Sequence, residues 1–345
     1  MLPLGLVLLM IPAWTRADDA TLRPNPAARL SRADEATEFW SLTARFSEGY
    51  RLFVRFGITN EGPGEQTAGA IWYLVRPDGR VSEFRNAHAQ GLWKLSPDHL
   101  RLDVASSSLD LHAPVRRLAI DSTSQGAKID LRFPAGDAPV PSAPLSAADF
   151  HAETLQVSDP VEGTIWVRGM AAPTSVRGTI ALTHAWMDES ITKLVQRYVE
   201  FVGATPDLTI HLLDVTTPAG DDHRRLLVER RGTIDYQTTD FELTLDSAEP
   251  WTRSRRYPVP GRLLIRDSRV NLDISLERLP LRTNPMEAVP EPFRLLFSFK
   301  IDPRWIWADA SLRIRLADGG QGPPVEADGQ GELAVSFLNP LPRPK

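Results

Sequence analysis

Alternation of apolar and polar residues is the feature that most restricts what this chain can fold into. Residues 51–59, 128–133 and 270–276 each place an apolar side chain at every second position, so an extended strand would carry one apolar face. Such runs recur along the chain and are separated by turn signals such as Pro77-Asp78-Gly79 and Asp328-Gly329. The pattern predicts an all-β protein of antiparallel strands, arranged as barrels or sandwiches.

Residues 188–202 depart from this period. The apolar residues in this segment recur at three- and four-residue steps, which indicates a helix: Ile191, Leu194, Val195, Tyr198 and Val199. The same residues also fit a turn followed by a strand, and both interpretations stay open.

The length of 345 residues is too great for one ordinary hydrophobic core and predicts two domains. We expect residues 38–185 to form the first domain and residues 186–345 to form the second. Residues 18–37 are rich in Pro, Ala, Arg and Asp and have no steady period, so we interpret them as a linker.

Residues 1–17 have the character of a secretory signal peptide. Fourteen almost wholly apolar residues precede Thr15-Arg16-Ala17, which offers a small residue before the cleavage site, although no Lys or Arg comes before the apolar stretch. This stretch is shorter than the roughly 20 residues that span a bilayer. A buried N-terminal segment is the alternative interpretation. Because the chain has no Cys, we expect a periplasmic or secreted protein that is stabilised by packing alone.

Composition and spacing argue against several classes of partner. The 39 basic and 44 acidic residues are well mixed along the chain, so no basic stripe predicts nucleic-acid binding. No metal site is expected, because six histidines lie scattered without a His-x-His or His-x-x-x-His pair: His88, His99, His112, His151, His211 and His223. A short basic run at Arg253, Arg255 and Arg256 could make peripheral contact with an anionic membrane lipid, with an exposed turn as the alternative.

The stretch at residues 176–190 carries the sharpest functional signal. One face of a strand here would present four largely apolar positions, followed by His184, Trp186 and Asp188. A strand that lines an apolar cavity and leaves its polar groups at one end would have this pattern. We therefore expect an apolar ligand, a lipid or isoprenoid, to lie beside these residues and near the junction of the two domains.

Three motifs resemble one bacterial family. Glu38-Phe39-Trp40, residues 185–189 (AWMDE) and residues 251–259 (WTRSRRYPV) together resemble the carotenoid 1,2-hydratase (hydroxyneurosporene synthase) family, over most of residues 38–300. The resemblance implies two lipocalin-like (calycin-type) β-barrels in tandem. It also implies that Asp188 corresponds to the acidic residue proposed to protonate the substrate alkene in that family. The residues after Asp188 and the opening motif depart from the hydratase pattern.

If the chain is an enzyme, the resemblance implies a hydro-lyase that adds water to an isoprenoid double bond. A carboxyl group that faces an apolar cavity stays protonated, and Asp188 would act as the acid in this way. The ring of Trp186 would stabilise a cation, and His184 would orient water or accept its proton. This chemistry needs no cofactor and no metal. We expect Trp186, Trp40 and Trp166 to contact the ligand.

Binding of the apolar ligand without chemistry is the first hypothesis, and hydration is its first alternative. The second alternative is an envelope scaffold whose barrels are filled by their own side chains, with His184 and Asp188 hydrogen-bonded at the domain junction and Trp186 filling its core.

Overall fold

The computed structural model describes residues 27–60, 66–88, 91, 93–96, 100–112, 114–122, 126–135, 144–250, 257–284, 303–317 and 323–338. The expected signal peptide, the first part of the expected linker (residues 18–26) and the basic run at Arg253, Arg255 and Arg256 lie outside the described residues. No helix among the described residues is long and apolar enough to cross a membrane.

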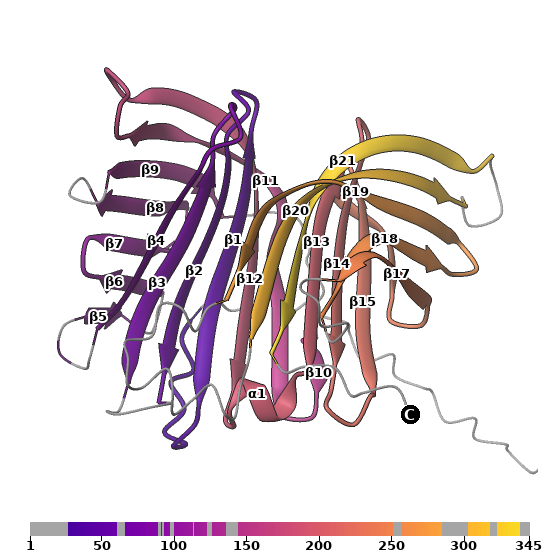
Figure 1. The fold of residues 1–345 in the computed structure, drawn as a ribbon, viewed down its shortest axis with the longest axis horizontal. Coiled ribbons are helices and arrows are strands. Elements are labelled where there is room, and N and C mark those ends of the chain that lie inside the picture. Colours follow the sequence, from indigo (N-terminus) through magenta and orange to yellow (C-terminus); the bar gives the residue numbers. More distant parts are fainter. Residues whose placement is uncertain are drawn as a thin grey trace, which may run out of the picture.

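The chain forms two antiparallel sheets in tandem, which confirms the all-β prediction (Figure 1). The first sheet contains β1 (Thr37–Phe46), β2 (Arg51–Thr59), β3 (Thr67–Val75), β4 (Val81–His88), β5 (Trp93–Ser96), β6 (Arg101–Val104), β7 (Ser107–Asp110), β8 (Val115–Ser122), β9 (Ala127–Pro134), β10 (Leu145–Ala147), β11 (Phe150–Val167) and β12 (Thr174–Met187). The second contains β13 (Arg197–Ala204), β14 (Leu208–Thr216), β15 (Asp222–Arg230), β16 (Thr233–Thr238), β17 (Glu242–Pro250), β18 (Pro258–Arg266), β19 (Val270–Thr283), β20 (Arg304–Leu316) and β21 (Val325–Phe337).

The two sheets share the same order of strands around their centres. In the first, β1 pairs with β2 and with the last strand, β12. In the second, β13 pairs with β14 and with the last strand, β21. Each sheet therefore has its first and last strands at its centre and curls into a half-barrel. Together the two half-barrels form the tandem lipocalin-like arrangement.

The short connection between the half-barrels replaces the helix expected over residues 188–202. Only α1 (Ile191–Leu194) is helical, and β13 begins at Arg197. The turn-then-strand interpretation is the one the structure supports, because the backbone of β13 pairs with neighbours on both edges. Tyr198 and Val199 consequently face opposite sides of the second sheet, toward the domain junction and the second core respectively.

Each half-barrel has its own apolar core on its inner face. In the first, alternate residues of β1 such as Leu42 and Ala44 meet alternate residues of β2 such as Leu52 and Val54. In the second, Phe201, Ile210 and Leu226 lie in the corresponding core. Period-two alternation therefore produces two separate interiors rather than a shared one.

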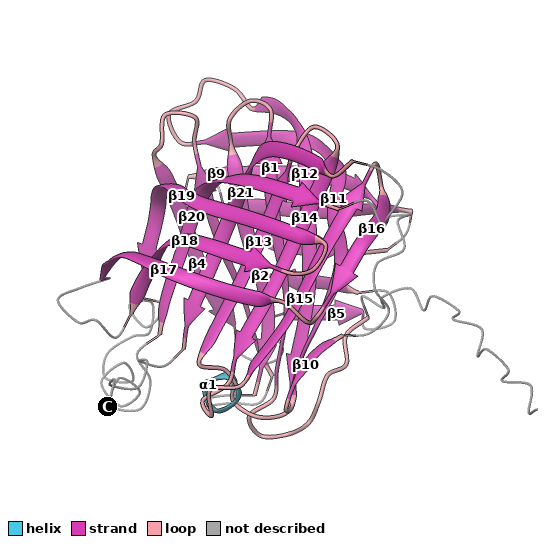
Figure 2. Ribbon diagram, turned by 90° about the vertical axis from the view of Figure 1, so that its right-hand side faces the viewer, coloured by secondary structure: helices cyan, strands magenta, loops and turns pink. Residues whose placement is uncertain are grey.

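The outer faces of the two sheets pack against each other and form the domain junction (Figures 1 and 2). Phe53 of β2 and Tyr73 of β3 contact Trp305 of β20, with ring centroids 4.6 and 4.8 Å apart. Near α1, Phe150 meets Tyr198 edge-on at 6.0 Å. Because central strands such as β1 and β12 are covered on both faces, their apolar residues are not confined to one parity.

Candidate functional site

The inner face of β12 follows the order expected from its sequence. Ile180 and Leu182 lie in the first core, His184 is fully buried, and Trp186 is partly exposed at the mouth of the half-barrel. The expectation that this face lies at the domain junction is wrong. The opposite face, with Thr183 and Ala185, packs toward the second sheet, so His184 lies one sheet thickness away from the junction.

Glu38 of β1 holds the imidazole of His184. Glu38 Oε1 lies 2.7 Å from His184 Nε2, and both groups are buried. The carboxylate also accepts backbone N–H hydrogen bonds from Arg29, at 2.9 and 3.1 Å, and from Leu30, at 3.0 Å. Because both carboxylate oxygens act as acceptors, Nε2 is the nitrogen that donates. Exchange of a proton with a ligand is therefore left to Nδ1.

Indole rings enclose the same imidazole. The Trp40 ring stacks on His184 with centroids 4.8 Å apart and planes 7° apart, and Trp186 lies on β12 with its ring centroid 5.1 Å from that of His184. His151 stacks on Trp186 at 5.4 Å. Trp40 and Trp186, two of the three tryptophans expected to contact a ligand, therefore both lie against His184.

Glu153 of β11 completes the polar end of the half-barrel. It faces His184 in the β11–β12 register, and its side chain is almost fully buried. Glu153 Oε1 accepts a hydrogen bond from Arg29 Nη2 at 3.0 Å, and the Arg29 guanidinium lies 3.7 Å above the Trp186 ring. Within the described part of the chain, Glu153 Oε2 and His184 Nδ1 are buried without a hydrogen-bond partner. A buried acceptor without a partner is costly, so these two atoms mark a place for a hydrogen-bonding ligand or water.

The expectation that Asp188 faces an apolar cavity and acts as an acid there is wrong. β12 ends at Met187, and Asp188 follows it as an exposed residue whose backbone N–H donates to Asp149 Oδ2 at 3.3 Å. Its carboxyl group is exposed and is not buried in an apolar cavity, so the environment on which its expected role as an acid depended is absent. The buried carboxyl groups beside His184 are those of Glu38 and Glu153.

Trp166 does not join this cluster. Its neighbours Ile165 and Val167 face the first core, so Trp166 projects from the other face of β11, where its indole N–H donates to the Met170 carbonyl at 3.0 Å. A ligand beside His184 would not meet it.

A small hollow opens at the mouth of the half-barrel. Its lining includes Arg29, Glu38, Trp186 and Asp188, and its volume is about 40 Å³. Such a volume holds a few water molecules, whereas typical ligand pockets exceed roughly 300 Å³. A larger ligand needs the residues that cover the mouth to move.

A second histidine–glutamate pair lies in the domain junction. His211 Nε2 is 3.3 Å from Glu200 Oε1, which also accepts a hydrogen bond from Thr183 at 2.6 Å. His211 Nδ1 lies 3.0 Å from Thr154 Oγ1, to which Arg225 donates at 2.8 Å. Both nitrogens of His211 are engaged and all these side chains are buried, so this network joins the two sheets.

Burial and partners set the charges in this junction network. Burial alone would raise the pKa of Glu200, but hydrogen bonds from His211 and Thr183 and the nearby Arg55 guanidinium hold that pKa below its usual value. Burial lowers the pKa of Arg225 to about 10, against the opposing effect of Tyr198. The network has the triad order Thr154–His211–Glu200, yet Thr154 is fully buried, so no substrate reaches its hydroxyl in this conformation.

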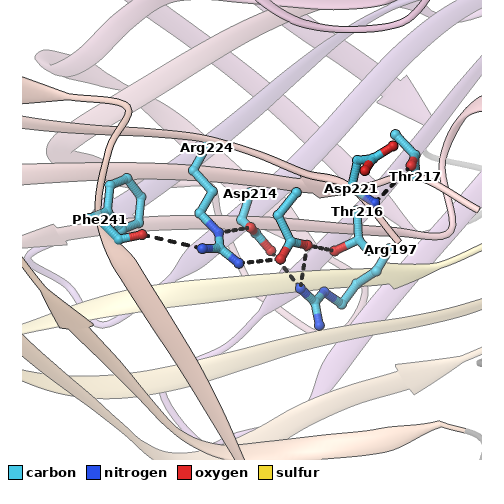
Figure 3. A network of polar contacts seen from close by, with 8 residues as sticks. Arg197, Asp214, Thr216, Thr217, Asp221, Arg224 and Phe241 are labelled. Atoms are coloured by element: carbon cyan, nitrogen blue, oxygen red, sulfur yellow. Dashed lines mark hydrogen bonds and ion pairs between the residues drawn. The ribbon is translucent and has the colours of Figure 1, made fainter. Parts of the chain in front are cut away.

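A third polar cluster fixes three strands of the second sheet (Figure 3). Asp214 of β14 is fully buried and receives Arg197 Nη2 and Arg224 Nε, each at 2.9 Å. Arg224 also donates to the Phe241 carbonyl at 3.3 Å. With both carboxylate oxygens paired, Asp214 is a structural residue.

Sequence reasoning missed Glu38, Glu153 and Arg29. Glu38 shares strand parity with Trp40 and Leu42, and this parity was an available signal for a carboxyl group in the interior. Parity predicts the interior position of Glu153 less clearly, because the pairing of β11 with β12 contains register irregularities between Thr154 and Asp159. Arg29 precedes the first strand, and no pattern in the neighbouring sequence predicts its contact with Glu153.

Solved structures support the fold. No protein-family model matches the chain, and no curated protein sequence matches it. A structure of CghA with Sch210972 is similar over 93% of this chain and 96% of its own, with a TM-score of 0.65 and 11% identity. A candidate AttH protein from Nitrosomonas europaea is similar over 92% and 99%, again with a TM-score of 0.65 and 11% identity. At this identity the likeness establishes the tandem lipocalin-like fold.

Proposed function

We propose that this protein binds a largely apolar molecule, a lipid or isoprenoid, at the mouth of its first half-barrel. The polar end of the ligand lies between His184 and Glu153, and its apolar part lies against Trp186 and Trp40. The observation that carries the proposal is the pair of buried acceptors, His184 Nδ1 and Glu153 Oε2, that have no partner among the described residues. The expected signal peptide makes the periplasm the proposed place of binding.

Two further observations support a binding role. The site joins an apolar row to a polar end, which is the usual composition of a small-molecule pocket. The CghA structure with Sch210972 is compatible with a ligand in a protein of this fold. In the junction network both ring nitrogens of His211 are engaged, so His211 offers no comparable unpaired atom.

Mass spectrometry of organic extracts tests the proposal. The protein is purified from its native envelope beside Trp186→Ala and Trp166→Ala, a matched pair of indole truncations at the mouth and on the outer face. We expect one lipid or isoprenoid to be enriched with the parent and Trp166→Ala and to be lost with Trp186→Ala. Empty extracts from a folded parent protein would contradict binding and favour a scaffold with filled barrels.

Addition of water to an isoprenoid double bond is a second candidate function, because Glu38 leaves Nδ1 of His184 available for proton exchange. In this reaction the protonated Nδ1 gives its proton to the alkene, water adds to the resulting cation, and the added water returns a proton to Nδ1. The faces of Trp40 and Trp186 stabilise the cation.

Two substitutions separate this candidate from binding alone. Turnover of an isoprenoid alkene by the parent is expected to persist in Asp188→Asn and to fall at least about 100-fold in His184→Gln. Ligand that is retained in extracts without turnover would contradict catalysis and leave binding intact.

A further inference from the structure

A strap at residues 27–36 crosses the mouth of the first half-barrel. Ala28 and Leu30 pack against the first core. The backbone of the strap is held by Glu38 and by Asn60, whose Nδ2 donates to the carbonyls of Ser31 at 3.2 Å and Ala33 at 2.7 Å. The strap therefore covers the polar end of the half-barrel, where the ligand is proposed to bind.

Arg29 is the strap residue that enters the site. Its guanidinium lies 3.7 Å above the Trp186 ring and 3.0 Å from Glu153 Oε1. The aromatic face and the carboxylate together are the groups that proteins use to bind cations. The side chain of Arg29 remains 44% exposed, whereas that of Glu153 is 7% exposed. The Arg29 guanidinium can therefore move into solvent, whereas the Glu153 carboxylate remains buried.

We propose that Arg29 occupies the place of a cationic group of the ligand, so that the ligand is an apolar molecule with an amine or guanidine head. This inference rests on the proposed function and specifies the chemical class of its ligand. The ligand displaces the Arg29 side chain, and its head takes over the contacts with Glu153 and Trp186.

The charge of Glu153 excludes the other head groups. A neutral ligand that displaced Arg29 would break the 3.0 Å ion pair of this buried carboxylate without replacing it, which is unfavourable even though Arg225 also interacts electrostatically with Glu153. An anionic head would add repulsion from Glu153 and Glu38. A cationic head keeps the pairing and can also donate to Glu153 Oε2 and His184 Nδ1, the two acceptors that Arg29 leaves unpaired.

The strap also indicates the shape of the ligand. Arg29 is flanked by Ala28 and Leu30, and the apolar side chains of both residues pack on the core while the cation enters the site. The strap thus presents one cation beside apolar groups, which is the chemical character of a cationic amphiphile. The strap occupies the mouth in this structure, which explains why the hollow beside Trp186 is only about 40 Å³.

Three matched isoprenoid probes test the inference on the full chain: geranylamine, geraniol and geranic acid. Their affinities are measured by isothermal titration calorimetry at pH 7, with quenching of tryptophan fluorescence as a second readout near Trp186. For the parent protein we expect the dissociation constant of geranylamine to be at least about tenfold lower than that of geraniol, with geranic acid the weakest.

Variants of the strap and the site give the decisive comparison. Arg29→Ala removes the internal competitor and is expected to tighten geranylamine at least about tenfold. Arg32→Ala, an exposed arginine of the same strap, is the matched control and is expected to leave the affinity unchanged. Glu153→Gln is expected to weaken geranylamine at least about tenfold and to tighten geraniol, because displacement of Arg29 then leaves no buried carboxylate without its ion-pair partner.

The outcomes distinguish the inference from the proposed function. Equal affinity for geranylamine and geraniol, or weaker geranylamine binding by Arg29→Ala, would overturn the inference and leave apolar ligand binding standing. Failure of all three probes to bind the parent and Arg29→Ala would overturn both. If Glu153→Gln does not fold, the comparison of Arg29→Ala with Arg32→Ala still decides the question.

Discussion

Glu38 and His184, on the adjacent antiparallel strands β1 and β12, are joined by a 2.7 Å contact between Oε1 and Nε2. The same carboxylate binds the backbone of the strap through Arg29 and Leu30. One side chain therefore orients the imidazole and also anchors the segment that covers it. The loss of Glu38 would therefore affect both the folding of the first half-barrel and the orientation of His184.

Removal of the Glu38 carboxylate should destabilise the first half-barrel. Glu38→Ala leaves buried donors of His184 and the strap unpaired, and we expect the free energy of unfolding to fall by about 3 kcal/mol. Glu38→Gln should cost less, about 1 kcal/mol, because the amide oxygen still accepts. Urea denaturation measures both, with the exposed Glu189→Ala as control. A loss below about 1 kcal/mol for Glu38→Ala would contradict the anchoring role.

The junction network should make stability depend on acidic pH. The pKa of Glu200 in the folded protein lies below its usual value of 4.5. Its contribution to stability is therefore fully present above about pH 4.5 and is lost as the pH falls through the lower folded-state pKa. The urea midpoint should decrease between pH 5 and pH 3, and Glu200→Gln should show a shallower decrease. Parallel profiles for the two proteins would exclude Glu200 as a source.

Glu332 should produce the opposite dependence near neutral pH. This glutamate is almost fully buried, and burial raises its pKa to about 7 despite the nearby Arg45 and Arg51 guanidiniums. Because the folded protein then binds the proton more tightly than the unfolded chain, the free energy of unfolding should fall as the pH rises from 4.5 to 7. The full decrease in the free energy of unfolding that arises from Glu332 is roughly 3 kcal/mol.

Glu332→Gln tests this effect. The variant should remove the slope between pH 4.5 and pH 7 and should raise the urea midpoint at pH 8. The Glu200→Gln protein serves as the comparison, because its change is confined to lower pH. A Glu332→Gln midpoint below that of the parent at pH 8 would show that the carboxylate is stabilising.

Gly178 should tolerate no side chain. A Cβ at this position of β12 would collide with the backbone carbonyl of Arg45 on β1, so the strands would have to separate. Gly178→Ala is expected to lower the free energy of unfolding by about 3 kcal/mol. Gly57→Ala is the matched control in β2, because the nearest atoms to its Cβ would lie 3.6 Å away. Equal midpoints for the two variants in thermal denaturation would rule out the close approach.

The sequence by itself determined the β architecture and the facing of β12. Alternation assigns side chains to faces through backbone geometry alone, so His184 and Trp186 share a face with Leu182 whichever strands pair with β12. The same reasoning placed Trp40 in an apolar strand. Parity does not show which of the two faces of a strand is the interior, and Trp166 lies on the face of β11 that points away from the first core.

Only the tertiary structure decided which carboxyl groups meet His184. Strand parity extended one step too far for Asp188, because β12 ends at Met187 and the alternation stops with the strand. Glu38 reaches His184 through the pairing of β1 with β12, a strand distant in the chain, and Glu153 lies opposite His184 in the register of β11 with β12. Arg29 reaches Glu153 from a segment without regular structure. Such contacts depend on the register and curl of the whole sheet. Alternation assigns each side chain to a face of its own strand, but it does not say which distant strand lies beside it, so these contacts appear only in the assembled sheet.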